Sequence, residues 1–289
     1  MDERIKEKVA SMTFMSDPLF KEAAKDKEFC QELLRTLYGD LELIVIENNP
    51  SFKINNLYGK EVELDALCIT GDGRYINIEV QNVNSDNIFK RARYNASILT
   101  SNIEPKGDLY RNVPNVCIIF ITKFDPFKDN LIIYHVDHVV RETGEKVNDG
   151  LEEIFVNTRV NDGSKIAELM RIFSTTSEYN DELFPKISET KRFFKTSLKG
   201  EKKMCEVTKE IYEMGLRDGE RNNREVYEEG IEEGIREGKK RGREEGKKKT
   251  LLTSIKNLMD SLKITAEKAM DALKIKEEDR EMYLKALQK

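Results

Sequence analysis

Two carboxylates and one amide are spaced so that they could meet on one face of a β-hairpin. Asp65 lies in a predicted strand at residues 61–70, while Glu79 and Gln81 lie in a second at residues 75–81. The intervening Gly-Asp-Gly is typical of a three-residue hairpin loop, in which a glycine adopts the left-handed conformation. Counting back from that loop places Asp65 opposite Glu79, and strand alternation places Gln81 on the same face.

The other face of this hairpin is predicted to be apolar. We expect it to pack into the hydrophobic core, because every second residue of both strands is hydrophobic. These residues are Val62, Leu64, Ala66, Cys68, Ile76, Ile78 and Val80.

Facing carboxylates on adjacent strands repel each other, so a cation or solvent must offset their charge. Magnesium suits such a pair, because it takes one or two carboxylate ligands and completes its shell with water and phosphate. Mn²⁺ is the expected substitute. The alternative is a half-exposed hairpin whose outer face is polar without any ligand, and the spacing alone leaves both interpretations open.

The surrounding elements follow an α/β pattern. Residues 26–38 predict an amphipathic helix that ends at Gly39, and residues 85–101 predict a second helix. Two further strands are predicted at 116–122 and 130–136, and the first of these is apolar throughout, as expected for a central strand covered on both faces. The order helix, two strands, helix, two strands predicts a mixed sheet flanked by helices.

The ordered motifs resemble those of the PD-(D/E)XK nuclease family transposases, also called recombination-promoting nucleases. Asp65 followed by Ile-Glu79-Val-Gln81 is similar to the D…ExQ variant of the nuclease motif, and the likeness extends over roughly residues 12 to 175. Two positions depart from the family pattern, which often has Arg where Glu63 stands and Tyr where Asn95 stands. Further matching segments are Arg91-Ala-Arg-Tyr94, Gly107-Asp-Leu-Tyr110, the strand at 116–121, Phe124-Asp-Pro-Phe127 and Ile154-Phe-Val-Asn-Thr158.

The resemblance implies a restriction-endonuclease-like α/β core that cuts DNA with Asp65 and Glu79 as ligands of Mg²⁺. Gln81 stands where related nucleases place Lys, and an amide can orient water or phosphate only through neutral hydrogen bonds. Positive charge at the site must then come from the metal or from Arg91 and Arg93. These two lie about 200° apart around a helix, so at most one can face the carboxylates.

Four basic residues, Lys60, Lys90, Arg91 and Arg93, are the predicted contacts to the DNA backbone. The alternative is that the three on the helix form an ordinary solvated face. With a formal net charge of −5, DNA binding would require such a local basic patch.

Seven glycines between 215 and 246 are separated by 4, 11, 4, 4, 4 and 4 residues, which places them on one stripe of a helix. Each interior glycine costs a helix about 1 kcal/mol relative to alanine, so close contact with a second helix would have to offset the loss. We expect Gly230, Gly234, Gly238 and Gly242 to mediate assembly into a homodimer or higher homo-oligomer. The alternative is a frayed or disordered linker.

Composition bears on the compartment and the domain organisation of the protein. Charged residues reach 36%, and no run approaches the ~18 apolar residues of a membrane span, so we expect no membrane partner. The four cysteines lie far apart without a CxxC pair, so we expect reduced thiols in a cytoplasmic protein. We also expect no small-molecule cofactor. The predicted domains are a nuclease-like domain at 1–190, a charged Gly-x-x-x-Gly segment at 191–249 and a small helical tail at 250–289.

The most specific hypothesis is a metal-dependent DNA endonuclease centred on Asp65, Glu79 and Gln81. The rival is a DNA-binding or self-associating protein on the same fold whose nuclease site has decayed. Gln81, Glu63 and the acidic balance favour the rival, whereas the facing carboxylates favour the enzyme. Recombination, transposition, defence and toxin roles all stay open.

Overall fold

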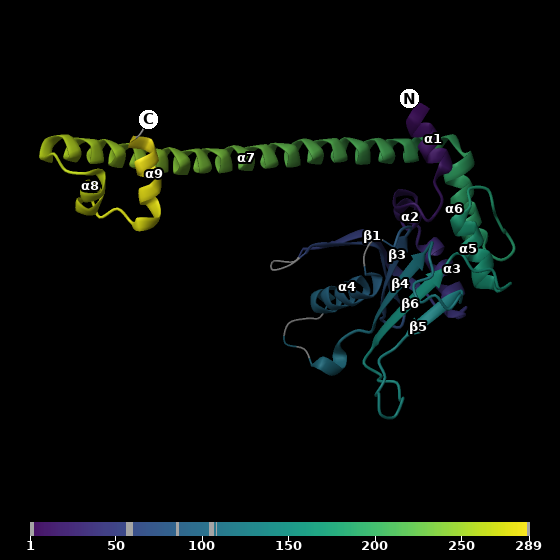
Figure 1. Cartoon of the computed structure of the whole chain (residues 1–289). Coiled ribbons are helices and arrows are strands. Elements are labelled where there is room, and N and C mark those ends of the chain that lie inside the picture. Colours follow the sequence, from purple (N-terminus) through teal and green to yellow (C-terminus); the bar gives the residue numbers. More distant parts are fainter. Residues whose placement is uncertain (1–2, 56–59, 85–86, 104–106, 108, 288–289) are drawn as a thin grey trace. The chain divides into compact units, whose positions relative to one another are not determined.

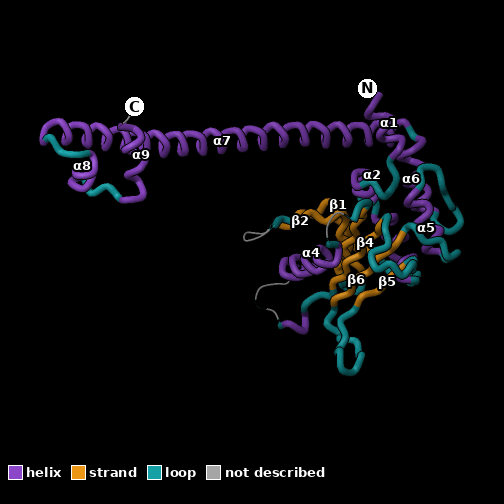
Figure 2. The backbone as a smooth tube through the Cα atoms, in the orientation of Figure 1, coloured by secondary structure: helices purple, strands orange, loops and turns teal. Residues whose placement is uncertain are grey.

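The computed structural model describes residues 3–55, 60–84, 87–103, 107 and 109–287, without the side chains of 216–235, 241, 244 and 278. The chain forms two compact units, Met1–Tyr212 and Glu213–Lys289. In the first unit, helices cover both faces of a central sheet (Figures 1 and 2).

The sheet in the described part of the first unit is mixed and has the strand order β1-β2-β3-β4-β6-β5. Pairing is antiparallel from β1 to β3, parallel from β3 through β4 to β6, and antiparallel between β6 and β5. The apolar strand β4 lies inside the sheet and every residue of it is buried, as predicted. The strands are β1 Val45–Ile54, β2 Val62–Thr70, β3 Tyr75–Gln81, β4 Val116–Thr122, β5 Ile133–Val136 and β6 Leu151–Asn157.

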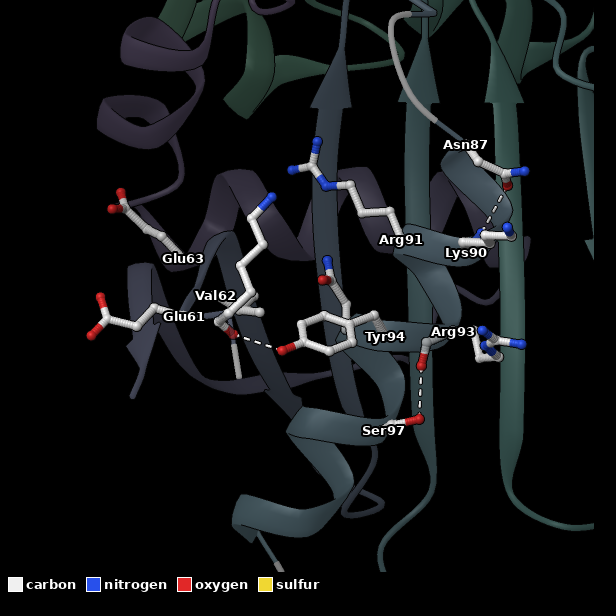
Figure 3. A pocket seen from close by; sticks show the side chains of 11 residues that line it. Glu61, Val62, Glu63, Asn87, Lys90, Arg91, Arg93, Tyr94 and Ser97 are labelled. Carbon is white, nitrogen blue, oxygen red and sulfur yellow. Dashed lines mark hydrogen bonds between the residues drawn. The ribbon is translucent and has the colours of Figure 1, made fainter. Parts of the chain in front are cut away.

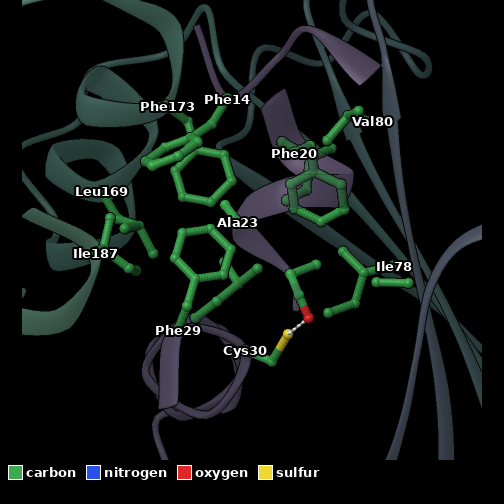
Figure 4. Close-up of a cluster of buried hydrophobic side chains, with 14 of the residues drawn as sticks. Phe14, Phe20, Ala23, Phe29, Cys30, Ile78, Val80, Leu169, Phe173 and Ile187 are labelled. Carbon is green, nitrogen blue, oxygen red and sulfur yellow. Dashed lines mark hydrogen bonds between the residues drawn. The ribbon is translucent and has the colours of Figure 1, made fainter. Parts of the chain in front are cut away.

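One face of the sheet packs against a group of helices through a phenylalanine cluster. Phe14, Phe20, Phe29 and Phe173 have ring centroids 5.1–6.4 Å apart, and they lie near Ile78 of β3 (Figure 4). The helices on this side are α1 Glu3–Ser11, α2 Asp17–Ala23, α3 Lys27–Tyr38, α5 Lys165–Ser174 and α6 Pro185–Thr196.

Helix α3 confirms the predicted helix at 26–38. The Asp26 side chain accepts a hydrogen bond from the Glu28 backbone N–H at 2.9 Å, which caps its start. Gly39 ends it with a φ of 65°, in the left-handed region that glycine adopts without strain.

The other face packs against α4, Ile88–Ile103. Ala92 and Leu99 of this helix are fully buried in one cluster with Ile118 and Phe120 of β4. A short 3₁₀ helix, η1 Tyr110–Asn112, follows. The sheet is therefore covered on both faces, and the predicted α/β fold with a mixed sheet is confirmed.

Two strands were missing from the prediction. Strand β1 includes Pro50, and its polar and apolar residues do not alternate regularly. Strand β6 begins at Leu151, which two glutamates follow, so neither segment has a clear strand pattern. Long-range pairing with β2 and β4 makes them strands. Along the chain, three strands precede α4 and three follow it, whereas two were predicted before it and two after it.

The prediction for the apolar face of β2 was partly wrong. Ala66 and Cys68 pack against the phenylalanine cluster as expected, but Val62 and Leu64 belong to the cluster under α4. Ser51 of the neighbouring strand has a φ of 56° at this point, so the regular pleat is broken. Asp65 lies at the break.

Helix α7, Leu198–Leu262, extends from the first unit into the second and carries the glycine stripe. In the second unit its end packs with α8, Ala266–Ala272, and α9, Glu277–Leu287, around Ile255. Thr265 caps α8 by accepting a hydrogen bond from the Lys268 N–H. None of the helices in the described residues has the length and apolar character needed to cross a membrane. The three predicted domain ranges stay a prediction.

Candidate active site

The β2–β3 hairpin has the predicted register. Gly73 has a φ of 83°, and its N–H donates to the Thr70 carbonyl at 2.9 Å. The Thr70 N–H in turn donates to the Arg74 carbonyl at 3.0 Å, and the residue pairs that follow keep this register. The last residue pair of this ladder is Ala66 with Ile78, so Asp65 and Glu79 are the next residues on the two strands.

Both carboxylates are buried, with side chains only 8% exposed for Asp65 and 1% for Glu79. Asp65 Oδ2 accepts the Val80 N–H at 3.0 Å, and the Asp65 N–H donates to the Glu79 carboxylate. Burial and the neighbouring charges of Glu79 and Asp17 raise the pKa of Asp65 to about 8. The ionised form of Asp65 is therefore costly in this environment unless additional positive charge reaches it.

Donors surround Glu79. Arg91 Nη2 lies 2.6 Å from Glu79 Oε2, while the amides of Asn77 and Asn95 donate to Oε1 at 3.1 and 3.5 Å. Burial raises the pKa of Glu79, and the charge of Arg91 opposes that rise. These contacts hold the carboxylate in one orientation.

Arg91 also contacts Gln81, because its Nη1 donates to Gln81 Oε1 at 2.9 Å. The Gln81 amide nitrogen donates to the Val83 carbonyl at 2.8 Å. Arg91 is therefore the arginine that faces the carboxylates, whereas Arg93 leaves the helix in another direction (Figure 3). This agrees with the expectation that at most one of the two could do so.

A cavity of about 850 Å³ opens beside α4, and Arg91 lies in its lining (Figure 3). Lys60, Lys90 and Arg93 line the same cavity, so the four predicted DNA-binding residues share one concave surface. The Tyr94 hydroxyl donates to the Lys60 carbonyl at 2.7 Å and ties the chain before β2 to α4.

Over residues 12–223 the chain matches the PD-(D/E)XK nuclease family transposases. The matched span covers more than half of the chain. It includes the hairpin, the basic helix α4 and most of the first unit. The protein belongs to this family. No curated protein and no solved structure matches the chain.

Membership of the PD-(D/E)XK nuclease family transposases supports a nuclease-type protein and makes both departures from the motif pattern informative. Asn95, where the family often has Tyr, donates to the buried Glu79. Glu63, where the family often has Arg, accepts a hydrogen bond from Lys21 of α2 at 2.9 Å. Both substituted side chains therefore contact groups of the site.

Asp17 and Lys21 of α2 were not among the residues predicted for the site. Lys21 Nζ lies 3.5 Å from Asp65 Oδ1 and 3.1 Å from Asp17 Oδ1. The only local signal is an acid four residues before a lysine, which is a common surface pair on helices. Nothing in that spacing relates it to a strand more than forty residues later.

Asp65 and Glu79 have the chemistry of a magnesium site. Within the described ranges, no group of three or more His, Cys, Asp or Glu side chains is arranged to hold a metal ion. Magnesium can be held by two carboxylates when water and phosphate complete its shell. Asp65 and Glu79 are two buried carboxylates close to each other, so they could serve as oxygen ligands of a divalent cation.

Proposed function

We propose that this protein is a metal-dependent DNA endonuclease that hydrolyses phosphodiester bonds. The observation that carries the proposal is the proximity of two buried carboxylates, Asp65 and Glu79, beside a cavity whose lining includes four basic side chains and two glutamates. Membership of a nuclease-type family supports it independently.

Asp65 and Glu79 would hold Mg²⁺, or Mn²⁺ in its place. When bound, such an ion polarises the phosphate and lowers the pKa of a water molecule. Arg91 bridges Glu79 and Gln81 at the cavity, so its guanidinium is placed to donate to a phosphate oxygen. Gln81, held by Arg91, would orient water or phosphate through its neutral amide.

The basic residues would position the DNA without reading its sequence. Lys60, Lys90 and Arg93 line the cavity beside Arg91, and lysine and arginine side chains bind the phosphate backbone. Binding through such contacts weakens as salt concentration rises, because counterions are released from the DNA. We therefore expect salt-sensitive DNA binding with little base preference from these four residues.

The test is incubation of the purified full-length protein with supercoiled plasmid and Mg²⁺, beside Asp65→Asn and Glu79→Gln. Nicking should require Mg²⁺, stop with EDTA and be lost in both variants, because each removes one carboxylate. Glu142→Gln, which changes an exposed carboxylate in the same way, should nick at the wild-type rate.

A second candidate, a non-catalytic DNA-binding module, is favoured by the arrangement at Glu79. Both of its carboxylate oxygens already accept hydrogen bonds from protein groups. Wild-type protein that binds plasmid with an affinity equal to that of Asp65→Asn, yet never nicks it, would support this candidate and reject the endonuclease. Nicking that persists in Asp65→Asn would mean that the site is wrongly placed.

We also propose that α7 mediates assembly into a homodimer or higher homo-oligomer. A Cβ added at Gly238 or Gly242 would meet no atom of the described residues within 4 Å, so α7 leaves space for a second helix at these two positions. The surroundings of Gly230 and Gly234 lie outside the described residues. Sedimentation should give an oligomer for wild type and a monomer for Gly238→Leu/Gly242→Leu. Lys240→Leu lies about 200° around the helix from Gly238 and should leave the oligomer intact. A wild-type monomer at tens of micromolar would contradict the proposal.

The cellular setting that we propose is a cytoplasmic one, with DNA as the substrate. The four cysteines, Cys30, Cys68, Cys117 and Cys205, are buried free thiols. Free thiols of this kind are typical of reducing compartments. The transposase family supports a role on DNA and leaves the target sequence open.

A further inference from the structure

The site contains a second cation besides Arg91, and it comes from α2. Gln81 is neutral, and both ends of its amide are already engaged, by Arg91 and by the Val83 carbonyl. Positive charge on the Asp65 side of the site therefore has to come from elsewhere. Lys21 is the lysine in contact with Asp65.

The Lys21 ammonium lies among three carboxylates. Its Nζ is 2.9 Å from Glu63 Oε1, 3.1 Å from Asp17 Oδ1 and 3.5 Å from Asp65 Oδ1. Only 19% of the side chain is exposed. The longest of the three contacts is the one to Asp65, so Glu63 and Asp17 hold the ammonium beside Asp65 without neutralising that carboxylate fully.

Helix α2 is a rigid support for this lysine. Leu19, Phe20 and Ala23 are buried in the core on either side of it. The next residue, Glu22, pairs with Lys203 of α7 at 2.7 Å. A lysine stem fixed in this way loses little further freedom when its ammonium binds a ligand, which is the condition for electrostatic stabilisation of a reacting group.

We propose that Lys21 is a catalytic residue whose ammonium donates to a non-bridging oxygen of the scissile phosphate, on the Asp65 side of the site. It provides the positive charge that Gln81 does not carry, while Arg91 serves the Glu79 side. Glu63 is then a positioning residue that holds Lys21. The proposal rests on the endonuclease function proposed above.

The position of Lys21 has two opposite consequences. Its charge stabilises the additional negative charge that develops on the phosphate during hydrolysis, so its removal slows cleavage. The same charge lies 3.5 Å from Asp65 and repels any divalent cation bound there, so its removal tightens metal binding. A purely structural lysine would weaken both cleavage and metal binding when replaced.

The experiment compares full-length wild type with Lys21→Met, and with Lys27→Met as an exposed control on the next helix. Single-turnover plasmid nicking, DNA affinity by fluorescence anisotropy, Mn²⁺ affinity by calorimetry without DNA, and thermal melting are measured for each. Lys21→Met should nick about 100-fold more slowly, bind DNA within twofold of wild type and bind Mn²⁺ several-fold more tightly. Lys27→Met should match wild type in every measurement.

Two rescue variants decide whether the charge itself matters. Lys21→Arg should retain at least a tenth of the wild-type rate, and Lys21→Met/Gln81→Lys should recover at least tenfold over Lys21→Met. Absence of both recoveries overturns the proposal. If Lys21→Met fails to fold, the same comparison is made from Lys21→Gln, which keeps a donor for Glu63.

Failure of this proposal is distinguishable from failure of the endonuclease function. If wild type never nicks plasmid, the endonuclease function fails and the role of Lys21 in it fails too. If wild type nicks and Lys21→Met nicks equally fast, only the role of Lys21 is rejected. Weaker Mn²⁺ binding or a lower melting temperature in Lys21→Met, together with slow nicking, would make Lys21 structural and overturn the proposal.

Discussion

Replacing Asp65 by asparagine should stabilise the protein, and the gain should grow as the pH rises. The carboxyl is 8% exposed and lies beside Glu79 and Asp17, so burial and these two acids raise its pKa from 3.8 to about 8. At pH 7 the unfolded chain carries an ionised Asp65 while the folded protein favours the protonated form. A pH of 7 lies about 3 units above the pKa of Asp65 in the unfolded chain. Holding the proton in the folded state therefore costs about 4 kcal/mol of stability.

Asparagine removes this cost because it has no charge to bury. Its side-chain oxygen can still accept the Val80 N–H that Asp65 Oδ2 accepts at 3.0 Å. The attraction between Asp65 and Lys21 at 3.5 Å is lost, which reduces the gain. We therefore expect Asp65→Asn to be about 2–4 kcal/mol more stable than wild type at pH 7, or roughly 5–15 °C in melting temperature.

The sign of the pH dependence follows from the raised pKa. Below about pH 4, Asp65 is protonated in both folded and unfolded states, so the two proteins should differ little. As the pH rises from about 4 to about 8, wild type loses stability because the folded state holds a proton that the unfolded state has released. Above about pH 8 the difference should be constant.

Urea denaturation at pH 4, 5.5, 7 and 8.5, without divalent cations, measures this difference. Glu142→Gln, an exposed carboxylate changed in the same way, should show no such trend. Added Mn²⁺ should stabilise wild type and not Asp65→Asn, because a ligand stabilises only the state that binds it. An asparagine variant that is less stable than wild type at pH 7, or a gap that does not change with pH, would refute the reasoning.

Two predictions concern the helices that support the site. Gly200→Ala should destabilise the first unit by about 2 kcal/mol, because a Cβ there would clash with the backbone carbonyl of Phe193, which cannot move aside alone; urea denaturation measures the loss. Lys191→Met should cost about 1–3 kcal/mol in the same assay, because the fully buried Lys191 ammonium donates to the carbonyls of Ile172 at 2.7 Å and Glu178 at 2.9 Å.

Matched control substitutions show whether these losses come from the named contacts or from the change of residue type alone. Gly246→Ala places a Cβ where the described residues leave nothing within 4 Å, so it should be neutral or stabilise α7 by up to about 1 kcal/mol. Lys27→Met removes an exposed lysine and should change stability by less than about 0.5 kcal/mol. A Gly200→Ala or Lys191→Met variant as stable as its control would contradict the corresponding contact.

Features that depend on neighbouring residues could be predicted from the sequence. The bounds of α3 follow from a capping Asp26 and a left-handed Gly39, which act within one turn of the helix. The proximity of Asp65 and Glu79 follows from a three-residue loop, because the loop sets the register of the two strands that it joins. The fold class follows from the same local patterns taken in order.

Features that depend on distant contacts could not be predicted from the sequence. The weakly patterned β1 becomes a strand because β2 offers it an edge, and the left-handed Ser51 then breaks the pleat next to Asp65. Either Arg91 or Arg93 could have faced the carboxylates, and the packing of α4 on the sheet decides that Arg91 faces Glu79.

The sequence by itself determined the α/β class, the hairpin register and the two facing carboxylates. Tertiary structure decided which cations surround them. Lys21 reaches Asp65 only because the apolar face of α2 packs into the core, which turns the opposite edge of the helix toward the site. Such a contact arises from packing between segments far apart in the chain, and no local spacing of residues encodes it.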